Sequence, residues 1–430
     1  MNYIKKNGYY IKDEGEYERI WVDPINYCIQ NFNKCSDDTI LCIFQDELHS
    51  VLNSYMSPFE LANKIKLCYP LIDDVSPAIE NHFKNLHILA RKSCSDRDLE
   101  FNDSVYILSK YKDRHLSPDV CAKILSILYK DLEKNVKNLR RSGSKYIEID
   151  KIEDKTYENK KFLRPVIFLK RYAQKELDDY FKTFILHGSL ATLDYVENWS
   201  DVDTYAVIKK DVISDYKKLS TLRNIIFKMI NYFLMIDPYQ HHGIFVNTEI
   251  DTEFYPQAYL PFAVMNNSRS FLASSEIEFI ERNEDIEKLN VFWNALQVMR
   301  KASVTRFPTK NYYVAKFFLA YLQTMPTYYL QAKNIHIYKK HSFDMIRKEF
   351  STDILKPVDI ASRYRNDMVQ SQVLPECILH NIGFQNPFTN LFAHHLLKNK
   401  IKKDVLHELD YRLISGSLVL CEDMLRKLEV

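Results

Sequence analysis

Two aspartates that stand two positions apart are the residues best suited to chemistry in this sequence. Asp201 and Asp203 follow a Gly188-Ser189 pair and open the apolar run Thr204–Ile208. Side chains two apart in a strand point to the same face, so both carboxylates would project into one small volume. Such carboxylates repel each other unless a cation sits between them, and a hard divalent cation, Mg²⁺ or Mn²⁺, suits them. The alternative is that they cap a turn at the start of the strand.

The Gly188-Ser189 pair is placed to hold the phosphate that would complete such a site. It follows the apolar run Thr183–His187, which we interpret as a strand. Glycine lets the backbone approach a ligand closely, and free N–H groups with a serine hydroxyl can bind phosphate oxygens. Two further Gly-Ser pairs, at residues 143 and 416, lack an Asp-x-Asp and flanking strands. Only the pair at 188 therefore has the context that the chemistry needs.

This stretch, HGS…SDVDTYAVI, resembles the signature of the DNA polymerase β-like nucleotidyltransferase superfamily. That signature is an apolar strand, Gly-Ser, a spacer of about ten residues and an Asp-x-Asp that opens a second apolar strand. The resemblance implies transfer of a nucleoside monophosphate from a nucleoside triphosphate to an acceptor hydroxyl, with release of pyrophosphate. It also implies that Asp201 and Asp203 hold the metals and that Gly188 and Ser189 grip the triphosphate.

The family usually places a third carboxylate on the neighbouring strand, after a helix. In the corresponding stretch, residues 236–255, the start of the expected strand carries His241 and His242, and Glu249 lies at its other end. We take Glu249 as the candidate third acid. His242 is the alternative, as a metal ligand or base, because neutral imidazole can do both, unless it is a hydrogen-bonded structural histidine. Without a third acid, a non-catalytic nucleotide-binding or scaffolding module is the competing function.

A basic segment further along the chain is a second candidate for contacts with the triphosphate. In this superfamily a helical domain often follows the catalytic one and supplies Lys, Ser or Tyr side chains. Lys339, Lys340 and Ser342 match that pattern here, and lysine binds phosphate well as a point charge. A solvated basic helix face is the alternative interpretation.

Three regions that differ in predicted secondary structure must position these residues. Residues 1–150 read as a mostly helical domain of unknown role, and residues 151–265 as the catalytic domain, in which strands alternate with helix. Residues 266–430 read as a helical domain that closes the nucleotide cleft. We therefore expect an α+β fold in which a small mixed sheet is flanked by helical regions.

Local patterns add several specific expectations. Three-and-four spacing of apolar residues predicts helices over Pro118–Leu139 and Phe59–Cys68, and the chain after residue 265 reads as helical, including Glu276–Ile286. The short apolar run Thr39–Phe44 is compatible with a strand. The charged stretch Lys145–Lys160 resembles a linker.

Composition limits the partners and the compartment. Among 430 residues, 46% are hydrophobic and 27% are charged, which excludes a disordered chain. The net charge of +2 argues against a general nucleic-acid substrate and favours a small-molecule acceptor, with a sugar, a protein side chain or an RNA end as other options. Eight cysteines form no Cys-x-x-Cys pair, and no signal peptide or membrane span is visible, so we expect a cytoplasmic protein with reduced thiols.

Overall fold

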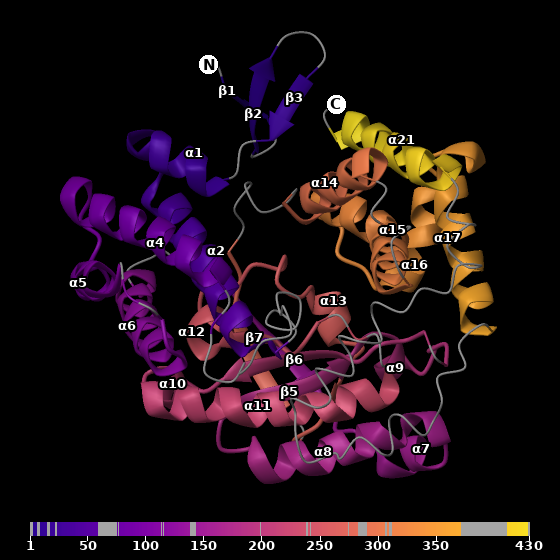
Figure 1. The fold of residues 1–430 in the computed structure, drawn as a ribbon, viewed down its shortest axis with the longest axis horizontal. Coiled ribbons are helices and arrows are strands. Elements are labelled where there is room, and N and C mark those ends of the chain that lie inside the picture. Colours follow the sequence, from indigo (N-terminus) through magenta and orange to yellow (C-terminus); the bar gives the residue numbers. More distant parts are fainter. Residues whose placement is uncertain are drawn as a thin grey trace.

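The computed structural model has the expected α+β architecture, in which helices surround small β-sheets (Figure 1). The described part of the chain comprises residues 3–6, 9–14, 18–21, 24–58, 75, 77–112, 114, 116–137, 143–197, 199–237, 240, 242–273, 275–282, 290–305, 308, 312–370 and 411–428. None of the helices in these ranges is both long enough and apolar enough to cross a membrane.

A four-stranded mixed sheet stands at the centre, with the strand order β7-β6-β5-β8. Strand β5 is antiparallel to both β6 and β8, whereas β6 and β7 are parallel. The parallel pair is joined through a helix, as a parallel crossover requires. The strands are β5 (Phe181–His187), β6 (Asp203–Ile208), β7 (Phe245–Thr248) and β8 (Arg269–Ser270).

Alternating side chains of these strands are buried in two separate hydrophobic cores. Phe184 and Ala206 point to one core, which contains apolar residues of helices α8 (Arg164–Glu176) and α11 (Tyr216–Ile236). Their sequence neighbours Ile185 and Tyr205 point to the other, which a two-stranded ribbon covers. Both faces of the sheet are therefore buried, which explains why its strands are apolar runs. The ribbon consists of β4 (Ser144–Ile149) paired with β9 (Ser275–Ile280).

The N-terminal helices share the first of these cores. A continuous set of buried apolar side chains runs from Ile25 to Leu272, so the chain before and after residue 150 is packed as one unit. The expected boundary at residue 150 does not separate two cores. The helices are α1 (Pro24–Gln30), α2 (Asp37–Met56), α4 (Pro77–Asp96), α5 (Asn102–Tyr111) and α6 (Pro118–Val136).

A buried polar network joins helix α2 to the sheet. The Asp251 carboxylate, which follows β7, accepts a 2.7 Å hydrogen bond from the Gln45 amide of α2. The buried His49 of α2 shares a 2.6 Å hydrogen bond with Asn247 of β7. Burial lowers the pKa of His49 to about 3, so the ring is neutral at pH 7. These bonds fix α2 against β7.

The C-terminal helices form a second, separate core. It contains apolar side chains from Phe292 to Leu428, joined by Trp199 from the loop that precedes β6. Strands β8 and β9 belong to the sheets, so this helical unit begins near residue 290 and not at 266. Its helices are α14 (Asn290–Thr305), α15 (Tyr312–Ala332), α16 (Lys339–Ile346), α17 (Thr352–Gln370) and α21 (Tyr411–Leu428).

Some local expectations are confirmed and others are wrong. The helix expected over Pro118–Leu139 is present as α6, with Ser117 capping its first turn. Residues Thr39–Phe44 lie inside α2 and are not a strand, because their apolar side chains continue a longer helical pattern. Glu276–Ile286 contains most of strand β9, whose buried residues alternate with exposed glutamates, a period of two, and residues 283–286 lie outside the described part. The helix expected over Phe59–Cys68 lies outside the described residues.

Shorter elements complete the fold. The linker expected over Lys145–Lys160 instead contains most of β4 and a short helix. The short helices are η1 (Phe32–Lys34), α7 (Asp154–Glu158), η3 (Lys161–Leu163), α9 (Gly188–Thr192), α10 (Lys210–Ile213), α12 (Glu249–Thr252) and α13 (Phe262–Met265). An antiparallel sheet near the N-terminus comprises β1 (Tyr3–Lys6), β2 (Tyr9–Glu14) and β3 (Glu18–Trp21).

One buried ion pair connects the C-terminal helices to the sheet unit. Lys316 of α15 lies 2.5 Å from the carboxylate of Asp237, which caps the end of α11, and both side chains are almost completely buried. The Lys316 ammonium also lies 5.6 Å from the centre of the Trp199 ring. Each charge depends on the other, because an unpaired charge at this depth has no water to solvate it.

We therefore expect Lys316→Met to lower the free energy of unfolding by about 3–5 kcal/mol, because it leaves Asp237 charged and buried. Urea denaturation followed by circular dichroism measures this. Lys348→Met, at an exposed lysine, is the matched control and should shift stability by less than about 0.5 kcal/mol. The double variant Lys316→Met/Asp237→Asn should recover part of the loss. A single variant as stable as the control would contradict this account.

Candidate functional site

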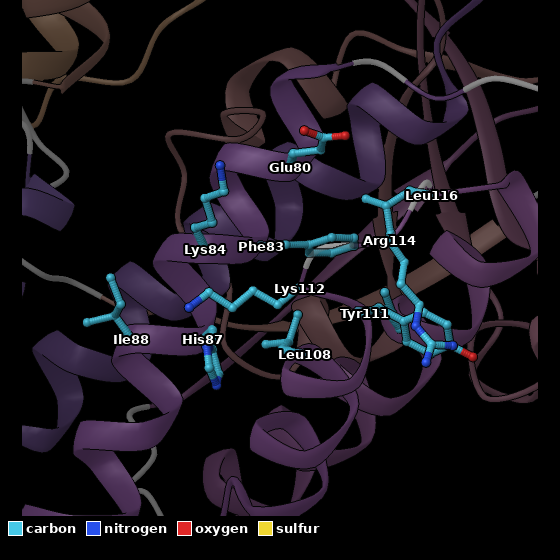
Figure 2. Close-up of a pocket in the computed structure, with 11 residues that line it drawn as sticks. Glu80, Phe83, Lys84, His87, Ile88, Leu108, Tyr111, Lys112, Arg114 and Leu116 are labelled. Atoms are coloured by element: carbon cyan, nitrogen blue, oxygen red, sulfur yellow. The ribbon is translucent and has the colours of Figure 1, made fainter.

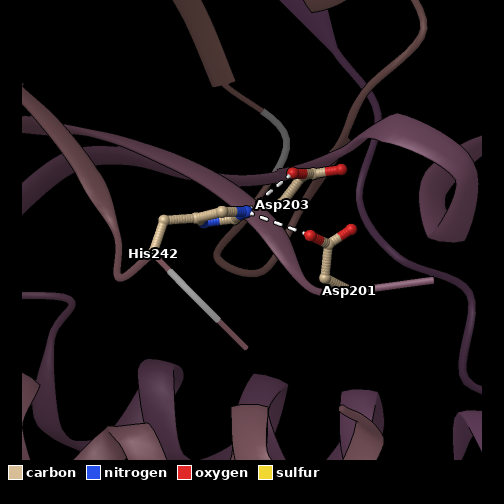
Figure 3. A group of neighbouring side chains, drawn as sticks. All are labelled: Asp201, Asp203 and His242. Atoms are coloured by element: carbon tan, nitrogen blue, oxygen red, sulfur yellow. Dashed lines mark ion pairs between the residues drawn. The ribbon is translucent and has the colours of Figure 1, made fainter. Parts of the chain in front are cut away.

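Three side chains meet at one edge of the central sheet. Figure 3 shows the His242 ring directed at the carboxylates of Asp201 and Asp203. The ring atom Nε2 lies 3.3 Å from Asp201 Oδ2 and 3.3 Å from Asp203 Oδ1. The side chains are 22%, 29% and 36% exposed for Asp201, Asp203 and His242, so a ligand can reach them. We call these three residues the Asp-Asp-His cluster.

The strand directions bring the cluster together. Asp203 is the first residue of β6, and His242 lies shortly before β7. Because these strands are parallel and Tyr205 lies opposite Phe245, the segments that precede them meet at the same edge of the sheet. His241 lies outside the described residues.

A buried glutamine fixes the two segments to each other. The Gln240 amide accepts a hydrogen bond from Val202 N at 3.0 Å and donates one to Val202 O at 3.1 Å. The same Nε2 donates to the backbone carbonyl of His242 at 2.9 Å. Gln240 thus holds the residue between the two aspartates and the backbone of the histidine that faces them. It is a positioning residue that the sequence analysis missed, since only tertiary structure identifies its partners.

Gly188 packs directly against one of the cluster carboxylates. Its φ angle is +68°, a backbone conformation that side chains disfavour, and a Cβ at this position would overlap with Asp203 Oδ2. Asp203 also lies opposite His187 in the pairing of β5 with β6. Gly188 and Asp203, which the sequence analysis assigned to one site, therefore lie close together in space.

Ser189 also lies beside the cluster segment, although it does not contact the carboxylates. Its hydroxyl donates a 3.0 Å hydrogen bond to the Ser200 hydroxyl, which accepts from Val196 N. Ser200 immediately precedes Asp201, so this bond ties the Gly-Ser turn to the start of the Asp-x-Asp.

The electrostatics of the cluster are set by its mutual contacts. Partial burial lowers the pKa of His242, but hydrogen bonds and negative charge from Asp201 and Asp203 outweigh burial and raise that pKa well above its ordinary value. A protonated ring offsets the repulsion between the carboxylates. Burial instead lowers the pKa of the neighbouring His187, although the charge of Asp203 opposes this.

Glu249, the candidate third acid, is not part of the cluster. It begins the short helix α12 at the far end of β7, where its carboxylate accepts a 2.8 Å hydrogen bond from Lys210 N and lies 4.0 Å from the Lys182 ammonium. Asp203 and Glu249 are at opposite ends of a parallel strand pair. The position beside the aspartates belongs to His242, so the assignment of Glu249 as a catalytic residue is withdrawn.

The segment with Lys339, Lys340 and Ser342 forms the start of α16, and its residues differ in their surroundings. Ser342 is fully buried and bonds to the Lys339 carbonyl at 2.6 Å, which removes it as a ligand for phosphate. Lys340 is exposed and Lys339 is half-buried. The preceding residue, Tyr338, contacts the Thr192 hydroxyl at 2.8 Å, so this segment adjoins the helix that carries Gly188.

Comparisons of this chain with protein-family models, with curated proteins and with solved structures find no match.

The chemistry of the Asp-Asp-His cluster suits a divalent cation. Two carboxylate oxygens and one imidazole nitrogen lie within 4.8 Å of one another, and all three side chains are partly exposed. Carboxylates and neutral imidazole are common ligands of divalent metals, and three protein ligands leave positions for other oxygens.

The contact between Gly188 and Asp203 yields a direct test of this arrangement. We expect Gly188→Ala to displace the Asp203 carboxylate and to weaken Mn²⁺ binding at least about tenfold, measured by electron paramagnetic resonance of free Mn²⁺. Strain from the positive φ should also lower stability by about 1–2 kcal/mol. Gly143→Ala is the control, because a Cβ there meets no atom within 4 Å. Equal Mn²⁺ affinity in both variants would show that Gly188 does not position the carboxylate.

Proposed function

We propose that this chain is a metal-dependent nucleotidyltransferase that moves a nucleoside monophosphate from a nucleoside triphosphate to an acceptor hydroxyl and releases pyrophosphate. One observation carries the proposal. The Gly188-Ser189 turn, the Asp-x-Asp and the start of the next parallel strand are adjacent at one sheet edge, with Gly188 packed against Asp203. This arrangement supports the proposal together with the sequence resemblance.

The chain's own residues have distinct roles in this proposal. Asp201 and Asp203 would hold Mg²⁺ or Mn²⁺, with His242 as the third ligand. Such a cation, when bound, neutralises phosphate charge and orients the reacting oxygens. The Gly188-Ser189 turn would receive the triphosphate next to the carboxylates, because its backbone approaches Asp203 with no side chain between.

The acceptor and the location follow from composition and thiol state. The net charge of +2 favours a small-molecule acceptor over general nucleic acid. Six cysteines in the described ranges are free thiols, which fits a reducing compartment, and we propose the cytoplasm.

A second candidate function is supported by the identity of the third residue. His242 stands where the family resemblance implies a carboxylate, and within the described residues no third acid joins Asp201 and Asp203. A protonated His242 would satisfy both carboxylates by itself. The competing proposal is therefore a nucleotide-binding or scaffolding module without transfer activity.

Transfer of label separates the two candidates. The full chain is incubated with each α-³²P-labelled nucleoside triphosphate, Mg²⁺ or Mn²⁺, and host extract, and labelled products are resolved by chromatography. We expect one nucleotide to give a labelled acceptor, and Asp203→Asn to reduce this at least about 100-fold, because it removes one of the two carboxylates that would hold the cation.

Asp211→Asn is the matched control, since Asp211 is an exposed aspartate that pairs with the surface residue Lys218. It should transfer label at the wild-type rate. Equal transfer by Asp203→Asn and wild type would exclude the aspartate role. If wild type binds nucleotide in a titration but labels no acceptor, the non-catalytic module is the correct function.

The histidine also predicts a metal preference. Imidazole favours first-row transition metals, whereas Mg²⁺ prefers oxygen ligands. We expect wild type to bind Mn²⁺ at least about tenfold more tightly than Mg²⁺ in isothermal titration calorimetry, and His242→Asp to reduce that ratio. An unchanged ratio in His242→Asp would show that the ring is not a ligand.

A further inference from the structure

A cavity of about 640 Å³ lies in the N-terminal helices, away from the Asp-Asp-His cluster. Helices α4, α5 and α6 and the turn after α5 line it, and none of these elements contributes a residue to the cluster. Its volume falls within the range of sites that bind small molecules, about 300–1,000 Å³. No role for these helices follows from the proposed function, so the cavity requires its own explanation.

The floor of the cavity is apolar, and its side chains are packed in the main core. Phe83, Leu108, Leu116 and Ile124 line it, and each is at most 6% exposed. The four side chains come from four different segments and belong to the main core, so the floor is fixed by packing.

The rim, in contrast, is cationic. Figure 2 shows Lys84, Lys112 and Arg114 placed around the floor, and all three are exposed. Within the described part of the chain, none of the three forms an ion pair with a carboxylate. Among the described residues that line the cavity, Glu80 is the one acid. As far as the described residues go, cations outnumber acids at this rim, close to an apolar surface.

The pKa of a histidine that lines the cavity is consistent with the positive charge of the rim. The His87 ring shares a 2.9 Å hydrogen bond with the Ser109 hydroxyl. Burial lowers the pKa of His87, and the positive charges of Lys112 and Arg91 lower it further. A neutral His87 can donate or accept a hydrogen bond to a polar group of a ligand.

We propose that this cavity binds a small organic anion. The apolar part of the anion would rest on the floor defined above, and its carboxylate or phosphate group would face Lys84, Lys112 and Arg114. The floor supplies affinity through burial of apolar surface, and the three cations select for negative charge. This site is independent of nucleotide transfer, since no residue is shared with the Asp-Asp-His cluster.

Isothermal titration calorimetry on the full chain tests the proposal with two probes. Decanoate represents an acyl carboxylate and 1-naphthyl phosphate an aryl phosphate, and 1-naphthol is the neutral analogue of the second. We expect at least one anion to bind with a Kd below about 1 mM, at least about tenfold tighter than 1-naphthol, and more weakly as salt is raised. Which anion binds identifies the class of the headgroup.

Two double variants that each remove two lysine charges, one pair at the rim and one pair elsewhere, complete the test. The double variant Lys84→Gln/Lys112→Gln should weaken anion binding about tenfold, because it removes two of the three rim cations. Lys110→Gln/Lys123→Gln removes two exposed lysines that do not line the cavity, and it should leave Kd within about twofold of wild type. Failure of both anions to bind, equal affinity for 1-naphthol, or equal weakening in the two double variants would overturn the proposal. None of these outcomes depends on transfer of label.

Discussion

The repulsion between two carboxylates at the start of β6 is the constraint on which the rest of the site depends. Asp201 and Asp203 stand on one short segment, so the fold must supply positive charge in front of them and hold their backbone in place. His242 supplies the first and Gln240 the second, and both come from the segment that precedes β7. The parallel pairing of β6 with β7 is therefore what makes the paired aspartates tolerable.

The same histidine connects two possible states of the site. A protonated ring neutralises the carboxylates through hydrogen bonds, whereas a neutral ring offers Nε2 as a ligand. Neither state requires the sheet to move, because Gly188, Gln240 and the pairing of His187 with Asp203 already fix the carboxylates. The two proposed functions would therefore differ in the protonation state of His242 and in whether a cation is bound, and not in the backbone of the site.

The sequence was sufficient for features that depend on short spacing. The proximity of Gly188 to Asp203 and the α+β fold class are encoded in local patterns of apolar runs and turn residues. The choice between His242 and Glu249 is different, since both flank β7 and only strand direction decides which end meets the aspartates. Gln240 has no signal in sequence, because its partners are backbone atoms. The sequence pattern over Glu276–Ile286 does not predict β9, because a period of two that lasts only six residues is too short to distinguish a strand from a helix.

The continuous core from Ile25 to Leu272 has a consequence for how the molecule can be dissected. Excising residues 151–265 by themselves would strip α2 and α6 from the sheet, and it would leave Asn247 and Asp251 without their buried partners from α2. Such a fragment would expose a large hydrophobic surface and would self-associate. The smallest fragment that keeps the sheet packed must therefore begin before α2, which makes the N-terminal helices part of the same folding unit as the sheet.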